Sequence, residues 1–264
     1  MWVKKEMPKV PSLEDSGAEN AKRFTSTCLS CLLTHRQAWI KEWMDKLGIN
    51  SMRSAIEFVI RNIDYPLTRG RPDDKHVWNA FSGKACYTIP FDYWQSADET
   101  LMTYVLNMKA KGAKGYGDCE DVSILTVSML RILDIPCYVV FGLVYQDSTL
   151  LGGHGWAIAE FPDGKWRLIE ATLDSPPSWF DGYPVVDKEK NMWKYYNITY
   201  EGWLMFNEKE YYEWEGNSSM FEKYAKIKFE EKETLRKHVA LSEAYKTKTK
   251  ALRKRGILGR IRWH

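Results

Sequence analysis

Long hydrophobic runs are absent from this sequence. The longest apolar stretches, residues 124–133 and 137–145, are about half as long as the ~20 residues that a membrane-spanning helix needs. The opening residues 1–17 carry acidic side chains and lack the apolar segment of a secretory signal. We therefore expect no membrane span and a cytoplasmic location.

Cysteine is also scarce. The chain has five cysteines among 264 residues, and an odd, dispersed set is not typical of a secreted disulfide framework. Cys28, Cys31 and His35 are spaced in a way that allows a zinc site, but no second pair of closely spaced ligands follows. We expect core thiols here, with a zinc-stabilised scaffold as the alternative.

Neither sign of charge dominates, since 38 basic residues stand against 35 acidic ones. The basic excess is concentrated in residues 246–262, which contain no acidic residue. Such a tail is most often a solvated end, but it is also compatible with attachment to nucleic acid or an anionic surface, or with docking to a protein partner. The sequence leaves these three interpretations open.

The sequence does contain enough apolar material for a core. Hydrophobic residues make up 44% and charged residues 28%, which excludes global disorder. The 12 tryptophans exceed what core filling usually requires, and some are expected to line a groove. We predict an N-terminal arm and helix over 1–50, a core domain over 51–207 and a helical, basic extension over 208–264.

Hydrophobic spacing and breaker residues predict the order of helices and strands. A helix buried in the middle of the domain is expected over 119–133, where almost no polar face remains. The pattern is that of an α+β fold in which this helix packs on an antiparallel β-sheet, between helical flanks and after a loosely held arm over 1–19. Further helices are predicted over 24–47, 52–62 and 97–108, and strands over 137–145, 154–161 and 166–173.

Cys119 opens the predicted buried helix directly after a glycine-rich stretch. Asp118 is a good N-cap residue, and Asp121 lies three positions further on, as in a capping box. Unpaired backbone N–H groups and the helix dipole favour a thiolate at this position. The negative charges of Asp118, Glu120 and Asp121 oppose ionisation of the thiol, so a cationic partner is needed.

His154 is the candidate partner, and its placement follows from hairpin register. Residues 161–165 suit a three-residue loop with proline first and glycine in the left-handed position. This register puts His154 and Glu170 on the same face of the sheet, whereas a two-residue loop would separate them. A carboxylate beside an imidazole fixes its tautomer and stabilises its cationic form, and a cationic imidazole beside a thiol activates it as a nucleophile.

Three sequence blocks carry these residues: GYGDCEDVSILTVSMLRILDIPCYVVFG, GGHGWAIAEF and KWRLIEAT. With a cysteine at a helix start and the other two residues on neighbouring strands, the blocks together resemble the transglutaminase-like superfamily of papain-like cysteine enzymes. The resemblance covers about residues 90–175, and the blocks are specific as a set. It implies a papain-like, transglutaminase-like core in which residues 51–207 form the catalytic domain.

The resemblance also implies residue roles. Cys119 would be the nucleophile, His154 the general base and acid, and Glu170 the orienting carboxylate. The family commonly has Asp where this chain has Glu170, so Asp174, four residues further on, is kept as a substitute.

An oxyanion hole is implied by the same resemblance. The upstream block YWQSADETL resembles a segment that precedes the cysteine in prokaryotic relatives. Acyl transfer needs donors for the developing oxyanion. The backbone N–H of Cys119 would be one donor, and the second would be Gln95 or, alternatively, Trp94.

The implied function is acyl chemistry on a peptide or glutamine-like amide through a thioester, with hydrolysis favoured over transfer to an amine. The expected partner is a peptide or protein amide substrate, and no metal or organic cofactor is implied. The alternative is a non-catalytic module on the same fold that binds a peptide or glycan, with the tail over 246–262 contacting nucleic acid or a protein partner.

Overall fold

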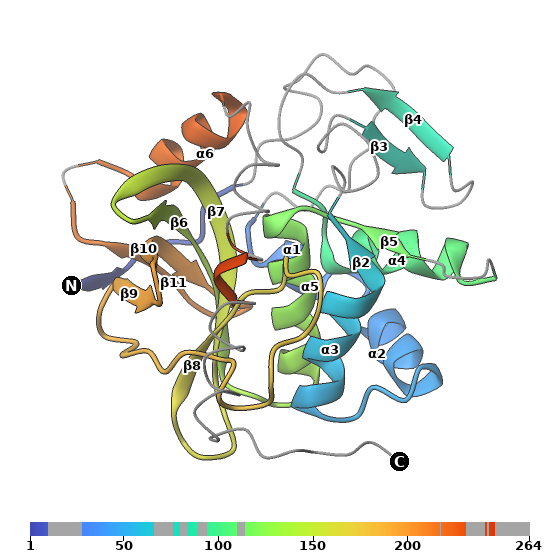
Figure 1. Cartoon of the computed structure of the whole chain (residues 1–264). Helices are drawn as coiled ribbons and strands as arrows, with labels where there is room; N and C mark the ends of the chain where they lie inside the picture. The colour runs from blue at the N-terminus through green and yellow to red at the C-terminus, as the bar shows by residue number, and fades with distance from the viewer. Residues whose placement is uncertain are drawn as a thin grey trace.

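The computed structural model describes residues 1–9, 28–65, 76–79, 84–88, 94–109, 114–216, 218–230, 241 and 243–245. Helices α1 to α5 gather on one side of an antiparallel sheet (Figure 1). This arrangement confirms the predicted α+β fold with a buried helix on the sheet. Among the helices of the described ranges, none is both long and apolar enough to cross a membrane.

The main sheet has seven strands, and every pairing within it is antiparallel. Its order is β1-β11-β10-β6-β7-β8, and β9 also pairs with β10. The strands are β1 Trp2–Lys4, β6 Cys137–Gln146, β7 Thr149–Glu160, β8 Trp166–Ile169, β9 Met192–Tyr195, β10 Ile198–Phe206 and β11 Tyr211–Trp214. Two small ribbons pair β2 Ile63–Asp64 with β5 Gly115–Tyr116, and β3 His76–Asn79 with β4 Lys84–Thr88.

Local capping signals start three of the helices. Ser51 and Ser96 cap α3 and α4, and each forms a capping box with the residue three positions further on. The predicted spans of these two helices and of α5 are confirmed to within one residue. The helices are α1 Cys31–Thr34, α2 Gln37–Lys46, α3 Met52–Asn62, α4 Ala97–Asn107, α5 Cys119–Ile132 and α6 Met220–Glu230.

Helix α5 is the centre of the core. Every residue from 119 to 130 is buried, and the helix packs against β6 and β7 and against α3 and α4. Two of its buried hydroxyls bond back to the preceding turn, Ser123 to the carbonyl of Cys119 at 2.6 Å and Thr126 to that of Val122 at 2.7 Å. Such bonds allow polar side chains inside an apolar layer without leaving a donor unpaired.

The single helix predicted over 24–47 is wrong, because α1 and α2 are separated by a break. Arg36 lies between them in the left-handed region, at φ 50°. His35 turns toward α4, where its Nδ1 is 2.9 Å from Oδ2 of the buried Asp98. The partner is 63 positions away, so hydrophobic spacing within 24–47 carries no signal of this break.

The two flanks contain more strand than predicted. Residues 2–4 of the expected loose arm form the edge strand β1, which pairs with β11. The expectation of helix from 208 onward is wrong for β11, although α6 follows it. The sheet therefore includes strands from all three predicted segments, 1–50, 51–207 and 208–264.

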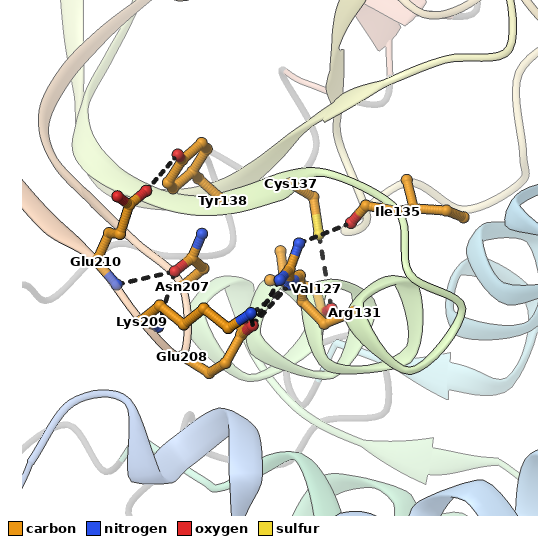
Figure 2. Close-up of polar contacts among 9 residues, drawn as sticks. All are labelled: Val127, Arg131, Ile135, Cys137, Tyr138, Asn207, Glu208, Lys209 and Glu210. Atoms are coloured by element: carbon orange, nitrogen blue, oxygen red, sulfur yellow. Dashed lines mark hydrogen bonds and ion pairs between the residues drawn. The ribbon is translucent and has the colours of Figure 1, made fainter.

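The C-terminal end of α5 is held to the turn between β10 and β11 (Figure 2). The guanidinium of Arg131 donates to both carboxylate oxygens of Glu208, at 2.6–3.0 Å, and to the carbonyl of Ile135 at 3.3 Å. Burial alone would raise the pKa of Glu208, but the hydrogen bonds and charge of Arg131 lower it. This ion pair anchors the helix at the end opposite Cys119.

Candidate active site

Cys119 is the first residue of α5 and is completely buried. Oδ1 of Asp118 accepts the backbone N–H of Glu120 at 3.1 Å, and Oδ2 of Asp121 accepts the backbone N–H of Asp118 at 3.2 Å. The side chain of Asp118 also accepts the backbone N–H of Asp121, which together with the second bond forms the predicted capping box; the box is thus confirmed. The sulfur therefore lies at the positive end of the central helix.

The thiol of Cys119 is bonded to its neighbour in the sequence. Sγ donates to Oε2 of Glu120 at 2.8 Å. The other oxygen, Oε1, accepts the hydroxyl of Tyr224 on α6. All three side chains are buried. Glu120, which the sequence indicated only as an opposing charge, is thus the hydrogen-bond partner of the thiol.

The predicted hairpin register between β7 and β8 is confirmed. The backbone N–H of Phe161 donates to the carbonyl of Lys165 at 2.9 Å, which closes the expected loop. The register that follows brings His154 and Glu170 together, with Nε2 2.7 Å from Oε2. Both residues are buried, so the pair is shielded from solvent.

Glu170 is surrounded by hydrogen-bond donors. Oε1 accepts the backbone N–H and the hydroxyl of Thr172, at 3.1 and 2.7 Å, and Oε2 also accepts the hydroxyl of Tyr200 at 3.0 Å. Burial alone would raise the pKa of Glu170, but the charge and hydrogen bond of His154 and the bonds from Thr172 hold it below its usual value. The carboxylate is therefore ionised at neutral pH and orients the imidazole.

The second nitrogen of His154, Nδ1, is buried and has no hydrogen-bond partner among the described residues. The next residue, Gly155, packs directly on the start of α5, because a Cβ built there would lie 3.0 Å from the carbonyl oxygen of Cys119. The strand with the imidazole and the helix with the thiol are thus in backbone contact. The thiol itself bonds to Glu120.

Gln95 lies against the helix cap. Its amide nitrogen donates to Oδ2 of Asp121 at 2.6 Å and to the carbonyl of Tyr116 at 3.4 Å, and its backbone N–H donates to Oδ1 of Asp121 at 2.7 Å. Trp94 is buried and packs on Phe141, with ring centroids 5.2 Å apart. Both predicted oxyanion candidates are therefore near the start of α5, and the Gln95 amide is already engaged there.

Glu170 contacts His154, whereas the substitute Asp174 is exposed in the loop beyond β8. The sequence reasoning also missed tyrosines around the pair. The hydroxyl of Tyr200 is 3.5 Å from that of Tyr245. Burial, together with neighbouring groups, raises the pKa of both phenols well above the usual value, so each remains a proton donor.

Tyr224 and Tyr245 were missed because they lie in the charged segment after 208. Tyr224 packs on Phe141, with ring centroids 4.9 Å apart, and Tyr245 packs on Tyr195 at 4.4 Å. The available signal was the apolar spacing of Phe221, Tyr224 and Ala225, which places one helix face against the core.

The residues near the thiol are poorly suited to bind a metal ion. Within the described ranges, the one group with three possible ligand atoms inside 4.8 Å of one another is Asp118, Cys119 and Glu120. Asp118 already caps the helix, and both oxygens of Glu120 accept hydrogen bonds. The group is explained as a helix cap and a thiol contact.

The zinc alternative receives no support from its three residues. Nδ1 of His35 contacts Asp98, and Sγ of Cys28 lies 3.2 Å from Oγ of Ser30. Cys28, Cys31 and His35 form no metal-ligating group in the part of the chain that the structure describes. The basic tail over 246–262 lies outside the described residues, and its roles stay predictions.

The chain is similar to one protein-family model and to one solved structure, as follows. Residues 66–171 match the family model of the Transglutaminase-like superfamily, and the matched range includes Cys119, His154 and Glu170. A solved structure from Cytophaga hutchinsonii, described as a "Putative Cysteine Protease", is similar at 16% sequence identity and a TM-score of 0.33. The similarity covers 56% of this chain and 40% of the other. No curated protein matched the chain.

Proposed function

Because residues 66–171 match the transglutaminase-like superfamily, we propose that this chain is a cysteine-dependent amide hydrolase that acts on a peptide or glutamine-like amide through a thioester. The observation that carries the proposal is the buried pair of His154 and Glu170, next to the backbone contact between Gly155 and Cys119. An imidazole oriented by a carboxylate beside a helix-start cysteine is the arrangement that activates a thiol.

The proposed reaction begins when the Cys119 thiol turns from Glu120 to Nδ1 of His154. The proton passes from Sγ to Nδ1 while Sγ forms a bond to the amide carbon. The C–N bond then breaks, Nδ1 returns the proton to the leaving nitrogen, and a thioester remains on Sγ. Water attacks the thioester carbon, its proton passes through Nδ1 to Sγ, and the carboxylic acid and the thiol are released.

Glu170 acts as a positioning residue in this scheme, because it holds Nε2 of His154 and leaves Nδ1 directed to the reaction. The developing oxyanion needs two donors. The backbone N–H of Cys119 is one, and Gln95 supplies the second when its amide leaves one of its present bonds, with Trp94 as the alternative. An amine in place of water would give transfer instead of hydrolysis by the same first step.

The test is turnover of a panel of peptide and glutamine-amide probes. The wild-type chain should release amine or ammonia, and Cys119→Ala and His154→Ala should each lower the rate by about 10³-fold or more. Asp174→Asn is the matched control and should keep the wild-type rate, because Asp174 is exposed in the loop and Glu170 is the carboxylate bonded to the imidazole. Equal turnover by wild type and Cys119→Ala would refute the proposal.

A second candidate is favoured by one observation. Cys119 and His154 are both completely buried, and the thiol bonds to Glu120, which suits a non-catalytic module that binds a peptide or glycan. Such a module would bind probes with equal affinity in wild type and Cys119→Ala and would turn over none of them. The same panel therefore separates the two functions.

A further inference from the structure

The thiol of Cys119 and the hydroxyl of Tyr224 donate to opposite oxygens of one carboxylate, that of Glu120. The carboxylate is completely buried and belongs to the residue next to the nucleophile. Tyr224 comes from α6, 104 positions further along the chain. A buried carboxylate with two donors is held in one orientation, because each lost bond would leave a polar group unpaired.

We propose that Glu120 keeps the Cys119 thiol protonated in the resting protein. We propose also that the hydrogen bond from Tyr224 to Glu120 weakens this effect. Glu120 and Tyr224 together would then set the pH at which the nucleophile ionises. This inference rests on the proposed function, in which Cys119 is the nucleophile, and it adds two residues to the machinery that controls it.

Titratable groups approach this region from three elements. Asp118, Glu120 and Asp121 belong to the start of α5, Tyr224 belongs to α6, and His154 belongs to β7. Glu120 accepts a hydrogen bond from the thiol. Ionisation of Cys119 while it faces Glu120 would put two negative charges at the 2.8 Å contact, so the carboxylate favours the neutral thiol.

Tyr224 acts on the thiol through Glu120. A hydroxyl that donates to Oε1 stabilises the carboxylate charge, so the carboxylate accepts a weaker hydrogen bond from the thiol. Without that hydroxyl, the carboxylate charge has one donor fewer, so the bond that Glu120 accepts from the thiol strengthens. Loss of Glu120 charge should therefore lower the ionisation pH of the thiol, and loss of the Tyr224 hydroxyl should raise it.

The opposite signs separate tuning from a merely structural role. A variant that only loosens the packing exposes Cys119 to water, and hydration favours the thiolate. A structural role would therefore move Glu120→Gln and Tyr224→Phe in the same direction, to lower pH.

The experiment is a pH titration of thiolate ultraviolet absorbance on the full chain. Wild type, Glu120→Gln and Tyr224→Phe are each measured against the same background carrying Cys119→Ser, so that the other thiols and the tyrosines subtract. We expect the midpoint to fall by about one pH unit in Glu120→Gln, which is about tenfold more thiolate at a fixed pH below the midpoint. We expect a smaller rise in Tyr224→Phe.

An unchanged or raised midpoint in Glu120→Gln would overturn the proposal, and so would a lowered midpoint in Tyr224→Phe. If near-ultraviolet circular dichroism shows that Glu120→Gln does not fold, the milder Tyr224→Phe decides by the sign of its shift, and no shift overturns the proposal. Absent turnover with both shifts present would refute only hydrolysis. Turnover that depends on Cys119 with neither shift would refute only the tuning.

Discussion

Nε2 of His154 and Oε2 of Glu170 lie 2.7 Å apart, with 1% and 0% of their side chains exposed. The contact joins the middle of β7 to the residue after β8, and Thr172 and Tyr200 supply further donors to the same carboxylate. A buried carboxylate with this many donors supports the fold and also fixes the imidazole, so its loss should be visible in both stability and activity.

Glu170→Gln keeps the shape of the side chain but removes the charge that supports a cationic imidazole. Turnover of the best amide probe should fall by about 10²–10⁴-fold, with near-wild-type circular dichroism. Steady-state kinetics on both proteins measures the effect. Wild-type turnover in the variant would mean that His154 does not depend on this carboxylate.

The same substitution has a pH signature. Because the pKa of Glu170 is lowered in the folded chain, its ionisation stabilises the fold above the unfolded pKa of ~4.3, and this stabilisation is lost as the pH falls through the folded value. The difference in the free energy of unfolding between wild type and Glu170→Gln should shrink as the pH falls below ~4. Urea unfolding at several pH values checks this, and a difference that grows as the pH falls below ~4 would contradict it.

Tyr200→Phe removes one donor from Glu170 while keeping the ring. A hydrogen bond to a charged group contributes about 1.5–3 kcal/mol, so the free energy of unfolding should fall by about that amount. Tyr183→Phe is the matched control, because within the described residues the buried Tyr183 hydroxyl has no hydrogen-bond partner; its removal should be neutral or stabilising. Urea unfolding of both variants measures the difference, and equal losses would argue against a special role for Tyr200.

Gly155→Ala should displace Cys119, the proposed nucleophile. The added Cβ would lie 3.0 Å from the carbonyl oxygen of Cys119, and overpacking of this kind costs about 1–3 kcal/mol. Gly164→Ala is the control, since its φ of +75° is strained for alanine by about 1–2 kcal/mol but its Cβ meets nothing within 4 Å. Turnover per folded molecule should fall in Gly155→Ala and not in Gly164→Ala, and an equal effect would show that the contact with α5 is unimportant.

Arg131→Lys tests the anchor at the other end of α5. A guanidinium meets both oxygens of Glu208, whereas an ammonium is a point donor, so we expect a loss of about 1 kcal/mol in the free energy of unfolding. Lys190→Met removes an exposed ion pair with Asp187 at 3.8 Å and should change nothing measurable. Thermal unfolding compares the variants, and a larger effect of Lys190→Met would refute the assignment.

Local signals were sufficient to predict much of the segment that contains Cys119, His154 and Glu170. The serine and aspartate caps of α3, α4 and α5 mark where those helices begin, because an N-cap acts within three or four residues. The loop over 161–165 set the register of its hairpin and so predicted the meeting of His154 and Glu170. The assignment of Cys119 to a helix start depended on the same short-range chemistry.

Contacts between segments far apart in the chain could not be predicted from local sequence. The hydroxyl of Tyr224 donates to Glu120 across 104 positions of the chain, and the break at Arg36 coincides with the contact of His35 with Asp98. The pairing of β1 with β11 joins the two flanks of the chain. Packing chooses among the rotamers and strand partners that local sequence leaves nearly equal in energy, so these features appear only when the chain has folded.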